Sequence, residues 1–501
     1  MINELMTQLA GDAPAPALSA LCEQARQKIG REEIDCQLGD RSLLHALLKA
    51  SEPKTRKNAA RLTGALLHEA DAPVLIAALA AETTMFVVPS ILLALGSVGG
   101  EQAHATLEAY APKLPENDSE EKHCAEIAAA HRKALAALSA DEPLPVYGLT
   151  VPRAVLLTAP EGFSEMLYEE LKERGYDPAV DVRGAIVVTE NLQKLFAVRC
   201  FYEAFLPLAQ NVPLEPEAIA KVAARELTLP YRIELRDYAG TLGDGAIDRG
   251  MFIAALTKVL GGDNNPSHYA LELRVVCHGD ACDLLLKPAS IPDGRFSYRA
   301  KAIPASIAPS LAACIARMAL KVRGSGTGAK ASDAAAGQPG LSAAHGFSVL
   351  DPFCGSGTLL FELEKRAAAI GNPCDTLLGI DIAAPAITAA RVNGGKAHSR
   401  AVFVQKDILS FIPRAPVDLI VSNLPFGNRV GNHKNNEALY RDLCSRLPGL
   451  LADGGVCVLY TMEYRLLSAC LKRVTKITLV STIRTEAGGL LPWIFVLRKK
   501  S

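Results

Sequence analysis

The sequence lacks several features that would place the chain in other classes of protein. No uninterrupted apolar run reaches the roughly 20 residues needed to span a bilayer, and residues 1–6 do not begin a basic segment followed by an apolar block. We therefore expect no membrane association and no secretory signal. None of the 12 cysteines belongs to a Cys-x-x-Cys pair, which argues against a zinc site or a disulfide framework and indicates reduced thiols in a cytoplasmic protein.

Composition places the chain among globular proteins. It has 501 residues, of which 49% are hydrophobic and 21% are charged, enough for two to four domains with their own cores. Residues 1–150 carry 13 Lys and Arg against 20 Asp and Glu, whereas residues 347–501 carry 19 against 12. The basic last third suits a polyanionic substrate, although ordinary solvation explains it equally well. The acidic first third favours protein partners over nucleic acid.

Residues 1–142 are expected to be helical, with two stretches that look alike. Residues 71–80 align with 101–110 at an offset of 30. Helix pairs at this period, with Gly96 and the pair Gly99 and Gly100 closing one of them, predict a HEAT-like domain. The concave face of such a domain binds proteins or packs on its own chain. A plain helical bundle is the alternative.

Residues 150–300 are expected to mix short strands and helices in an α+β module that begins as a ferredoxin-like unit does. The expected strands are 154–158, 184–189, 231–236, 269–276 and 283–287, and the expected helices are 162–174, 191–202 and 249–260. Near the end of this region Arg295 and Arg299 stand beside Phe296 and Tyr298, and such a group can clamp single-stranded nucleic acid. A strand with one solvated face is the alternative. The next region, 301–346, predicts a helix from Pro309 to Val322 and then a flexible linker rich in Gly, Ala and Ser.

Residues 347–501 alternate strand and helix, which is typical of an α/β domain of the Rossmann-like kind. The loop that starts at Asp351 follows a buried strand, and its Gly355 and Gly357 let the backbone approach a ligand at the positive end of the next helix. No Gly-x-x-x-x-Gly-Lys phosphate loop is present. Asp381 ends the second strand about 25 residues after the glycines, the spacing of a ribose acceptor. Asp407 follows the third strand and could receive an adenine amino group.

The stretch Val417 to Gly427 carries the expected chemistry. An apolar strand delivers Asn423, Leu424, Pro425 and Phe426 to its carboxyl end, where α/β sheets place their ligand crevices. The side-chain carbonyl of Asn423 and the main-chain carbonyl of Leu424 can each accept one N–H of an exocyclic amine. Pro425 fixes the turn, and Phe426 offers a ring face to a base. Alone, this pattern also fits a strand that merely ends in a turn.

Four motifs occur in order: 351–358 (Asp-Pro-Phe-Cys-Gly-Ser-Gly-Thr), 379–381 (Gly-Ile-Asp), 405–407 (Gln-Lys-Asp) and 423–429 (Asn-Leu-Pro-Phe-Gly-Asn-Arg). Together they resemble S-adenosylmethionine-dependent amino-methyltransferases, and more narrowly the THUMP-domain RNA guanosine-N2 methyltransferases. The resemblance is specific over residues 295–501, looser over 150–295 and absent over 1–140.

The resemblance implies a set of roles for residues that match the motifs. S-adenosyl-L-methionine would be the cofactor and RNA, most simply tRNA, the substrate. The implied cofactor-binding residues are Asp351, Cys354, Gly355, Gly357, Thr358, Asp381 and Asp407. The implied catalytic residues are Asn423, Leu424, Pro425 and Phe426, and phosphate contacts are expected from Arg429 and Lys434.

The sequence departs from the family at two points. Asn428 stands where relatives often carry Lys, and no complete THUMP fold is traceable between 205 and 295. RNA recognition is therefore expected to be altered, with the acidic helical domain modulating partner choice.

Other functions remain open at this point. Guanine-N2 methylation of rRNA, adenine-N6 methylation of DNA or RNA, and amide methylation of a protein glutamine use related amine or amide chemistry. A non-catalytic helical-repeat scaffold is an alternative of another class, although intact motifs argue against a relic. A nicotinamide-dependent oxidoreductase would need a tighter glycine pattern than residues 355–360 supply.

Overall fold

A computed structural model describes residues 2–9, 11, 14–25, 28–112, 115, 118–138, 143–237, 240, 248–304, 306–325, 346–425 and 433–500. The chain divides into two compact units. The first comprises Met1–Tyr147 and Val212–Cys282, and the second comprises Gly148–Asn211 and Asp283–Ser501. Each unit is described by itself.

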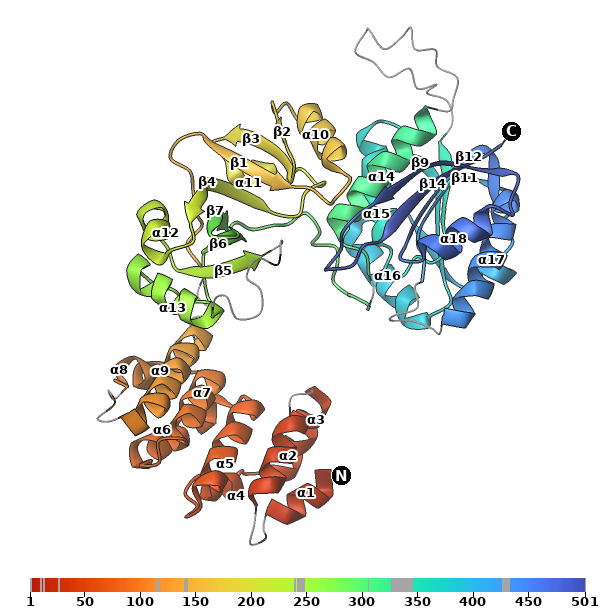
Figure 1. Cartoon of the computed structure of the whole chain (residues 1–501). Helices are drawn as coiled ribbons and strands as arrows, with labels where there is room; N and C mark the ends of the chain where they lie inside the picture. The colour runs from red at the N-terminus through yellow and green to blue at the C-terminus, as the bar shows by residue number, and fades with distance from the viewer. Residues whose placement is uncertain are drawn as a thin grey trace. The chain divides into compact units, whose positions relative to one another are not determined.

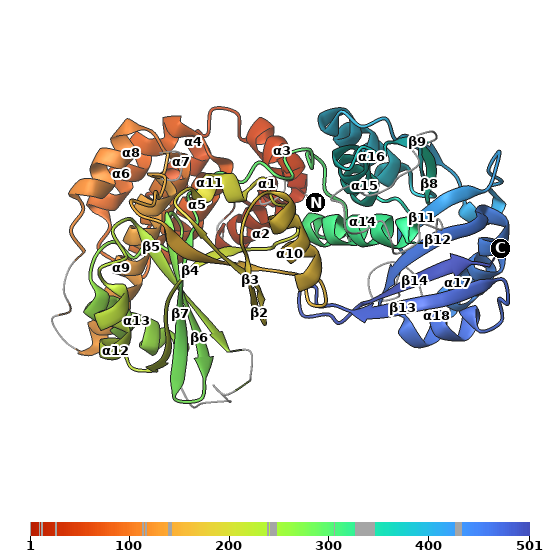
Figure 2. The same ribbon diagram turned by 90° about the horizontal axis from the view of Figure 1, so that it is seen from above.

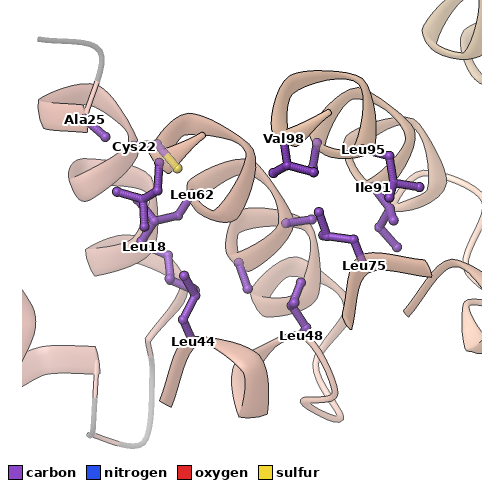
Figure 3. Packing of buried hydrophobic residues seen from close by; sticks show 14 of the residues in the cluster. Leu18, Cys22, Ala25, Leu44, Leu48, Leu62, Leu75, Ile91, Leu95 and Val98 are labelled. Carbon is purple, nitrogen blue, oxygen red and sulfur yellow. The ribbon is translucent and has the colours of Figure 1, made fainter. Parts of the chain in front are cut away.

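The first unit begins with a helical region, as the sequence predicts. Its helices are α1 (Ile2–Leu9), α2 (Ala15–Ala25), α3 (Lys28–Leu38), α4 (Ser42–Leu47), α5 (Pro53–Leu66), α6 (Ala72–Ala81), α7 (Val88–Val98), α8 (Glu101–Ala109) and α9 (Asp118–Leu138), with a short 3-10 turn η1 (Glu69–Asp71). Apolar side chains such as Leu18, Leu62, Leu75 and Ile91 fill the space between these helices (Figure 3). Burying them supplies the stabilisation of the region.

Two helix pairs of the first unit stack on one another. Helix α5 packs on α7 and α6 packs on α8, so the stretches that align in the sequence occupy like positions. Glycine permits the closest approach: a Cβ on Gly64 would lie 2.8 Å from the Ala94 Cα, and one on Gly96 would lie 2.6 Å from the Ala134 Cα. Gly96 therefore lies inside α7 as a packing residue and does not end that helix, contrary to expectation. Membership of the HEAT family stays a prediction.

The rest of the first unit holds a short α/β segment. It contains α12 (Pro216–Ala223), β5 (Tyr231–Asp237), α13 (Arg249–Leu260) and β6 (Leu271–His278). Strands β5 and β6 are parallel, and α12 packs on α13. Strand β5 and helix α13 lie where the sequence predicts them, whereas α12 was not predicted.

The second unit opens with a small α+β module. Its elements are β1 (Arg153–Thr158), α10 (Ser164–Glu173), β2 (Ala179–Asp181), β3 (Gly184–Thr189), α11 (Leu192–Leu195), β4 (Ala204–Pro213) and β7 (Ala281–Pro288). The strands follow the order β2-β3-β1-β4-β7. The expected helix over 191–202 is wrong beyond Leu195. There the N–H groups of Arg199 and Cys200 donate to the Glu170 carboxylate, at 2.9 Å each, instead of to preceding carbonyls.

The second unit also holds a seven-stranded sheet in the order β10-β9-β8-β11-β12-β14-β13. The strands are β8 (Phe347–Asp351), β9 (Cys374–Asp381), β10 (Val402–Gln405), β11 (Val417–Asn423), β12 (Leu451–Thr461), β13 (Ile477–Arg484) and β14 (Trp493–Lys499). The first five are parallel, and β14 is antiparallel to both of its neighbours. The expected Rossmann-like fold is confirmed.

Helices cover both faces of this sheet (Figures 1 and 2). On one side lie α14 (Pro309–Gly324), α15 (Thr358–Ala369) and α16 (Ala384–Ala397), and on the other lie α17 (His433–Leu450) and α18 (Tyr464–Leu471). Helix α14 lies where the sequence predicts it and packs on α15, β11 and β12. The predicted linker that follows it lies mostly outside the described residues.

Ion pairs and hydrogen bonds hold the α+β module against α15. The Glu362 carboxylate accepts two hydrogen bonds from Arg199, both at 2.7 Å, and one from the Tyr298 hydroxyl at 2.7 Å. Glu362 is only 2% exposed. One turn further along, Arg366 pairs with Glu173 of α10 at 2.8 Å. The module and the sheet domain therefore form one body around α15.

Replacing Glu362 should weaken this body. We expect Glu362→Ala to cost about 3–5 kcal/mol of unfolding free energy, because Arg199 would be left buried without its anion. The measurement is urea denaturation followed by the fluorescence of Trp493, the single tryptophan of the chain, which lies in β14 of the same unit. Lys365→Ala, on the exposed side of α15, should change the midpoint little. Equal midpoints for the two variants would contradict the assignment.

Candidate active site

The site lies at the carboxyl ends of β8 and β11, two neighbouring parallel strands. The strands next to β8 and those next to β11 extend the sheet in opposite directions. Strand β11 pairs with β8 through Leu419 opposite Val349 and Ile420 opposite Leu350. From β8 the order runs outward to β9 and β10, and from β11 it runs outward to β12. Such a reversal opens a crevice at the carboxyl ends of the strands. Asp351 and Asn423, the last residues of β8 and β11, both reach this edge.

Asp351 is a buried carboxyl at this reversal. It is 1% exposed, and its Oδ1 accepts the Ser422 hydroxyl of β11 at 2.7 Å and the Phe353 N–H at 3.1 Å. Burial raises the pKa of Asp351 to about 7, although the bond from Ser422 acts in the opposite direction. The residue thus ties the two central strands together and titrates near neutrality.

Asp381 connects the second strand with the glycine turn. One of its carboxylate oxygens accepts the Gly355 N–H at 3.0 Å, and the other accepts the Ala383 N–H at 2.9 Å. The Cys354 N–H also reaches this strand, donating to the Ile380 carbonyl at 2.8 Å. Each carboxylate oxygen has a second lone pair, so Asp381 can still accept hydroxyl groups of a ligand.

The two glycines of the turn have different roles. Gly355 has φ of +52° and lines the cavity described below. Gly357 has φ of +84°, and a Cβ there would meet the Phe361 ring at 2.5 Å and the Phe403 ring at 3.0 Å. It does not line the cavity. Glycine is therefore required at 357 by packing, and we do not place this residue against a ligand.

Asn423, Leu424 and Pro425 leave β11 beside β12. The Leu424 N–H donates to the Tyr460 carbonyl at 2.9 Å, which continues the strand pairing by one residue. The Pro425 carbonyl accepts the Tyr440 hydroxyl of α17 at 2.9 Å. Neighbouring elements on both sides thus hold the loop.

A directed chain of hydrogen bonds supports the Tyr440 hydroxyl. The Glu463 N–H donates to the Thr461 hydroxyl at 2.9 Å, and the Thr461 and Tyr440 hydroxyls are 2.7 Å apart. Because Tyr440 gives its own proton to Pro425, its oxygen is left to accept from Thr461. Tyr440 is fully buried, so this chain of hydrogen bonds fixes its hydroxyl against the carbonyl of Pro425.

The glycine turn and the carboxyl ends of β9 and β11 line one cavity of about 540 Å³. This volume is typical of small-molecule sites. Nine predicted site residues line it: Asp351, Cys354, Gly355, Thr358, Asp381, Asp407, Asn423, Leu424 and Pro425. Burial raises the pKa of the Cys354 thiol far above its usual value, so this cysteine is a poor nucleophile. The Asp407 carboxylate accepts the Leu409 N–H at 2.9 Å and is exposed toward the cavity rim.

Several lining residues were not predicted from the sequence. They are Ile303, Pro304, Ser306 and Ile307 before α14, Ser356 in the turn, Lys406 beside Asp407, and Asn436 and Leu439 on α17. Asn436 is 3% exposed, and no described residue accepts a bond from its side-chain N–H₂. Ser356 and Lys406 lie inside the motifs 351–358 and 405–407, whereas the residues before α14 and those on α17 lie outside all four motifs and only the tertiary fold brings them to the strand ends.

The remaining predicted residues are placed differently. Phe426 and Arg429 lie outside the described residues, as does the side chain of Lys434. Arg295 is buried. Its guanidinium pairs with Asp293 at 2.7 Å, donates to the Phe201 carbonyl at 2.9 Å and lies 3.8 Å over the ring of that residue. Arg295 is thus used inside the α+β module, and we leave it out of the proposed RNA contacts. Arg299 is half-buried in the turn that follows.

Comparison with known proteins agrees with this geometry. Residues 342–491 match the family model described as "RMKL-like, methyltransferase domain". This part of the chain, which we term the methyltransferase domain, is similar to that family over 342–491. The match includes the ends of β8, β9 and β11 but leaves out the residues before α14 that line the same cavity.

Relatives resemble part of this chain in sequence, and solved structures resemble a larger part of it in fold. The tRNA (guanine(6)-N2)-methyltransferase of Thermus thermophilus is 32% identical over 160 residues, which are 31% of this chain and 45% of that protein. The chain thus matches less than half the length of this curated relative. Among solved structures, TrmN from Thermus thermophilus gives a TM-score of 0.50 at 24% identity over 69% of this chain and 99% of that one. SMU.472, complexed with SAH, gives 0.50 at 14% identity over 70% and 100%. Both likenesses concern the fold alone.

No helix among the described residues is long and apolar enough to cross a membrane. All 12 cysteines lie in the described part of the chain, and none of them is assigned to a disulfide.

The titration of Asp351 should appear in the stability of the methyltransferase domain. In the unfolded chain its pKa is about 3.9, so between pH 4 and 7 the unfolded state loses this proton while the folded state keeps it. The resulting cost is absent below pH 4, grows as pH rises and is complete above pH 7, reaching up to about 4 kcal/mol.

Asp351→Asn removes the ionisable group and keeps an oxygen for Ser422 and Phe353 to donate to. We expect its unfolding free energy, followed through Trp493, to fall less between pH 5 and 8 than that of the unaltered protein. Parallel pH profiles would show that Asp351 ionises normally in the folded state.

Proposed function

We propose that this protein transfers a methyl group from S-adenosyl-L-methionine to the exocyclic amine of a base in RNA, with guanosine N2 of tRNA as the substrate. One observation carries the proposal. The glycine turn with Asp381 and the end of β11 with Asn423, Leu424 and Pro425 line a single cavity. A cofactor half and an acceptor half therefore face the same space.

The residues of the cofactor half fit the proposed donor. The Asp381 carboxylate is suited to ribose hydroxyls and Asp407 at the rim to the adenine amino group, because both are hydrogen-bond acceptors. The turn at Cys354 and Gly355 would hold the amino-acid end of the donor at the start of α15, where main-chain N–H groups favour a carboxylate. When bound, the donor supplies an electrophilic methyl group on a sulfonium. SMU.472, which has a similar fold, is complexed with SAH, the demethylated form of the donor.

The residues of the acceptor half orient the amine. The Asn423 and Leu424 carbonyl oxygens would each accept one amine N–H, so that the nitrogen lone pair points toward the donor. The buried Asn436 side chain offers a donor for a ring nitrogen beside the amine. We retain Phe426 as the stacking partner of the base and Arg429, Lys434 and Arg299 as expected RNA contacts. Catalysis then rests on positioning, and none of these residues has to form a covalent bond.

The choice of tRNA guanosine rests on the relatives and on charge. The Thermus relative named for guanine-N2 methylation of tRNA is 32% identical to this chain over 160 residues. The excess of basic side chains in residues 347–501 suits an RNA backbone. A base must leave its helix to reach such a cavity, which favours unpaired or splayed nucleotides. We further propose a cytoplasmic location, in keeping with the free thiols, and a protein partner for the acidic helical region.

The test is methylation of purified total tRNA and rRNA by the full-length protein, with the modified nucleosides identified by mass spectrometry. We expect N2-methylguanosine in tRNA. Asn423→Ala should lower the rate about 100-fold or more, because one group that orients the amine is lost, while calorimetry should show unchanged cofactor affinity. Asn372→Ala, outside the cavity, is the control. Methylated adenosine, methylated rRNA or full activity of Asn423→Ala would each refute part of the proposal.

The hydroxyl of Tyr440 should matter for turnover and not for cofactor binding. Tyr440→Phe keeps the ring and removes the bond to the Pro425 carbonyl, so the loop can shift; we expect a rate about tenfold lower with an unchanged dissociation constant for S-adenosylhomocysteine. Tyr464→Phe, on the partly exposed α18 beside Trp493, is the matched control. If both variants turn over alike, the hydrogen-bond chain does not position the loop.

A further inference from the structure

A segment outside the matched methyltransferase domain forms one wall of the cavity. Residues 301–304 and 306–308, which we term the crossing segment, connect the α+β module to α14. Its Ile303, Pro304, Ser306 and Ile307 all line the cavity. The Ile303 side chain also lies against the glycine turn, since a Cβ on Gly355 would be 3.3 Å from the Ile303 Cδ1. The segment therefore packs against the glycine turn and lines the same cavity.

A buried asparagine fixes the crossing segment to the methyltransferase domain. The Asn393 side chain of α16 accepts the Lys301 N–H at 2.8 Å and donates to the Lys301 carbonyl at 2.9 Å. The same N–H₂ group donates to the Ser356 carbonyl in the glycine turn at 3.3 Å. Asn393 is fully buried. One buried side chain thus links the crossing segment to the glycine turn, and its bond to Ser356 is buried.

Three hydroxyl groups meet where the segment faces the turn. The Ser306 hydroxyl donates to the Ile303 carbonyl at 2.9 Å and lies 3.3 Å from the Ser356 hydroxyl, which lies 3.5 Å from that of Thr358. All three residues line the cavity. Hydroxyls can turn their protons toward an anion. They surround the start of α15, where the helix itself favours negative charge.

We propose that the crossing segment completes the subsite for the amino-acid end of the cofactor, with the Ser306 hydroxyl as a carboxylate-binding group and Asn393 as its positioning residue. This inference rests on the proposed function, since it concerns the same cavity. It means that the methyltransferase domain alone does not contain the whole cofactor site. The α+β module, through the segment that leaves it, supplies part of that site.

The test compares two probes that differ only at the end in question. S-adenosylhomocysteine carries the carboxylate and ammonium, whereas 5′-methylthioadenosine lacks both. With full-length Ser306→Ala we expect calorimetry to show S-adenosylhomocysteine binding about tenfold weaker, because a hydrogen bond to a charged group is lost, and 5′-methylthioadenosine binding unchanged. Asn393→Ala should show the same selective loss. The double variant should lose little more than the weaker-binding single variant.

Thr388→Ala is the control on α16, since its hydroxyl donates to the Ala384 carbonyl of its own helix; both affinities should be unchanged. If Ser306→Ala binds S-adenosylhomocysteine as tightly as the unaltered protein, or weakens both probes equally, the subsite assignment is wrong while the proposed function stands. If the unaltered protein does not bind S-adenosylhomocysteine, both fail. A loss for Asn393→Ala that is equal for the two probes would mean a structural role only.

Discussion

The parallel pairing of β8 with β11 is the constraint on which the site depends. It places the ends of two strands side by side at the point where the sheet order reverses, so a turn that follows one strand and a loop that follows the other must share one crevice. The hydrogen bond from the Ser422 hydroxyl to the Asp351 carboxyl joins the same two strands. A carboxyl buried there is costly, and its raised pKa is the sign of that cost. The buried Asp351 carboxyl thus lowers the stability of the fold at the point where the glycine turn and the loop after β11 meet.

Residues of the α+β module, which lie outside the methyltransferase domain, also hold the site in place. Helix α15 starts at the glycine turn and carries Glu362 one turn later, where Arg199 and Tyr298 hold it. From Tyr298 the chain continues into the crossing segment and then into α14. The α+β module is consequently fixed to the cofactor side of the cavity. Any RNA that docks on this module would be held at a set distance from the amine-binding loop.

The sequence predicts much of the catalytic domain because its signals are local. Apolar runs mark the buried strands, and polar residues at their ends mark the crevice, so the sequence alone places Asp381 and Asn423 at that edge. The sequence does not show where a long-range contact gives a candidate residue a packing role. Gly357 serves the packing of Phe361 and Phe403, and Arg295 is taken up by Asp293 and Phe201. Ser306 and Tyr440 carry no motif, since their partners lie 50 and 15 residues away along the chain and only the tertiary fold brings them together.

The proposed reaction requires the bound donor and the loop after β11 to face one another across one cavity. A crystal structure of the full-length protein with S-adenosylhomocysteine tests it most directly. The account predicts the ribose on Asp381, the amino-acid end at the start of α15, and the sulfur directed toward the side-chain oxygen of Asn423. A ligand bound elsewhere, or an Asn423 side chain turned away from the sulfur, would contradict it.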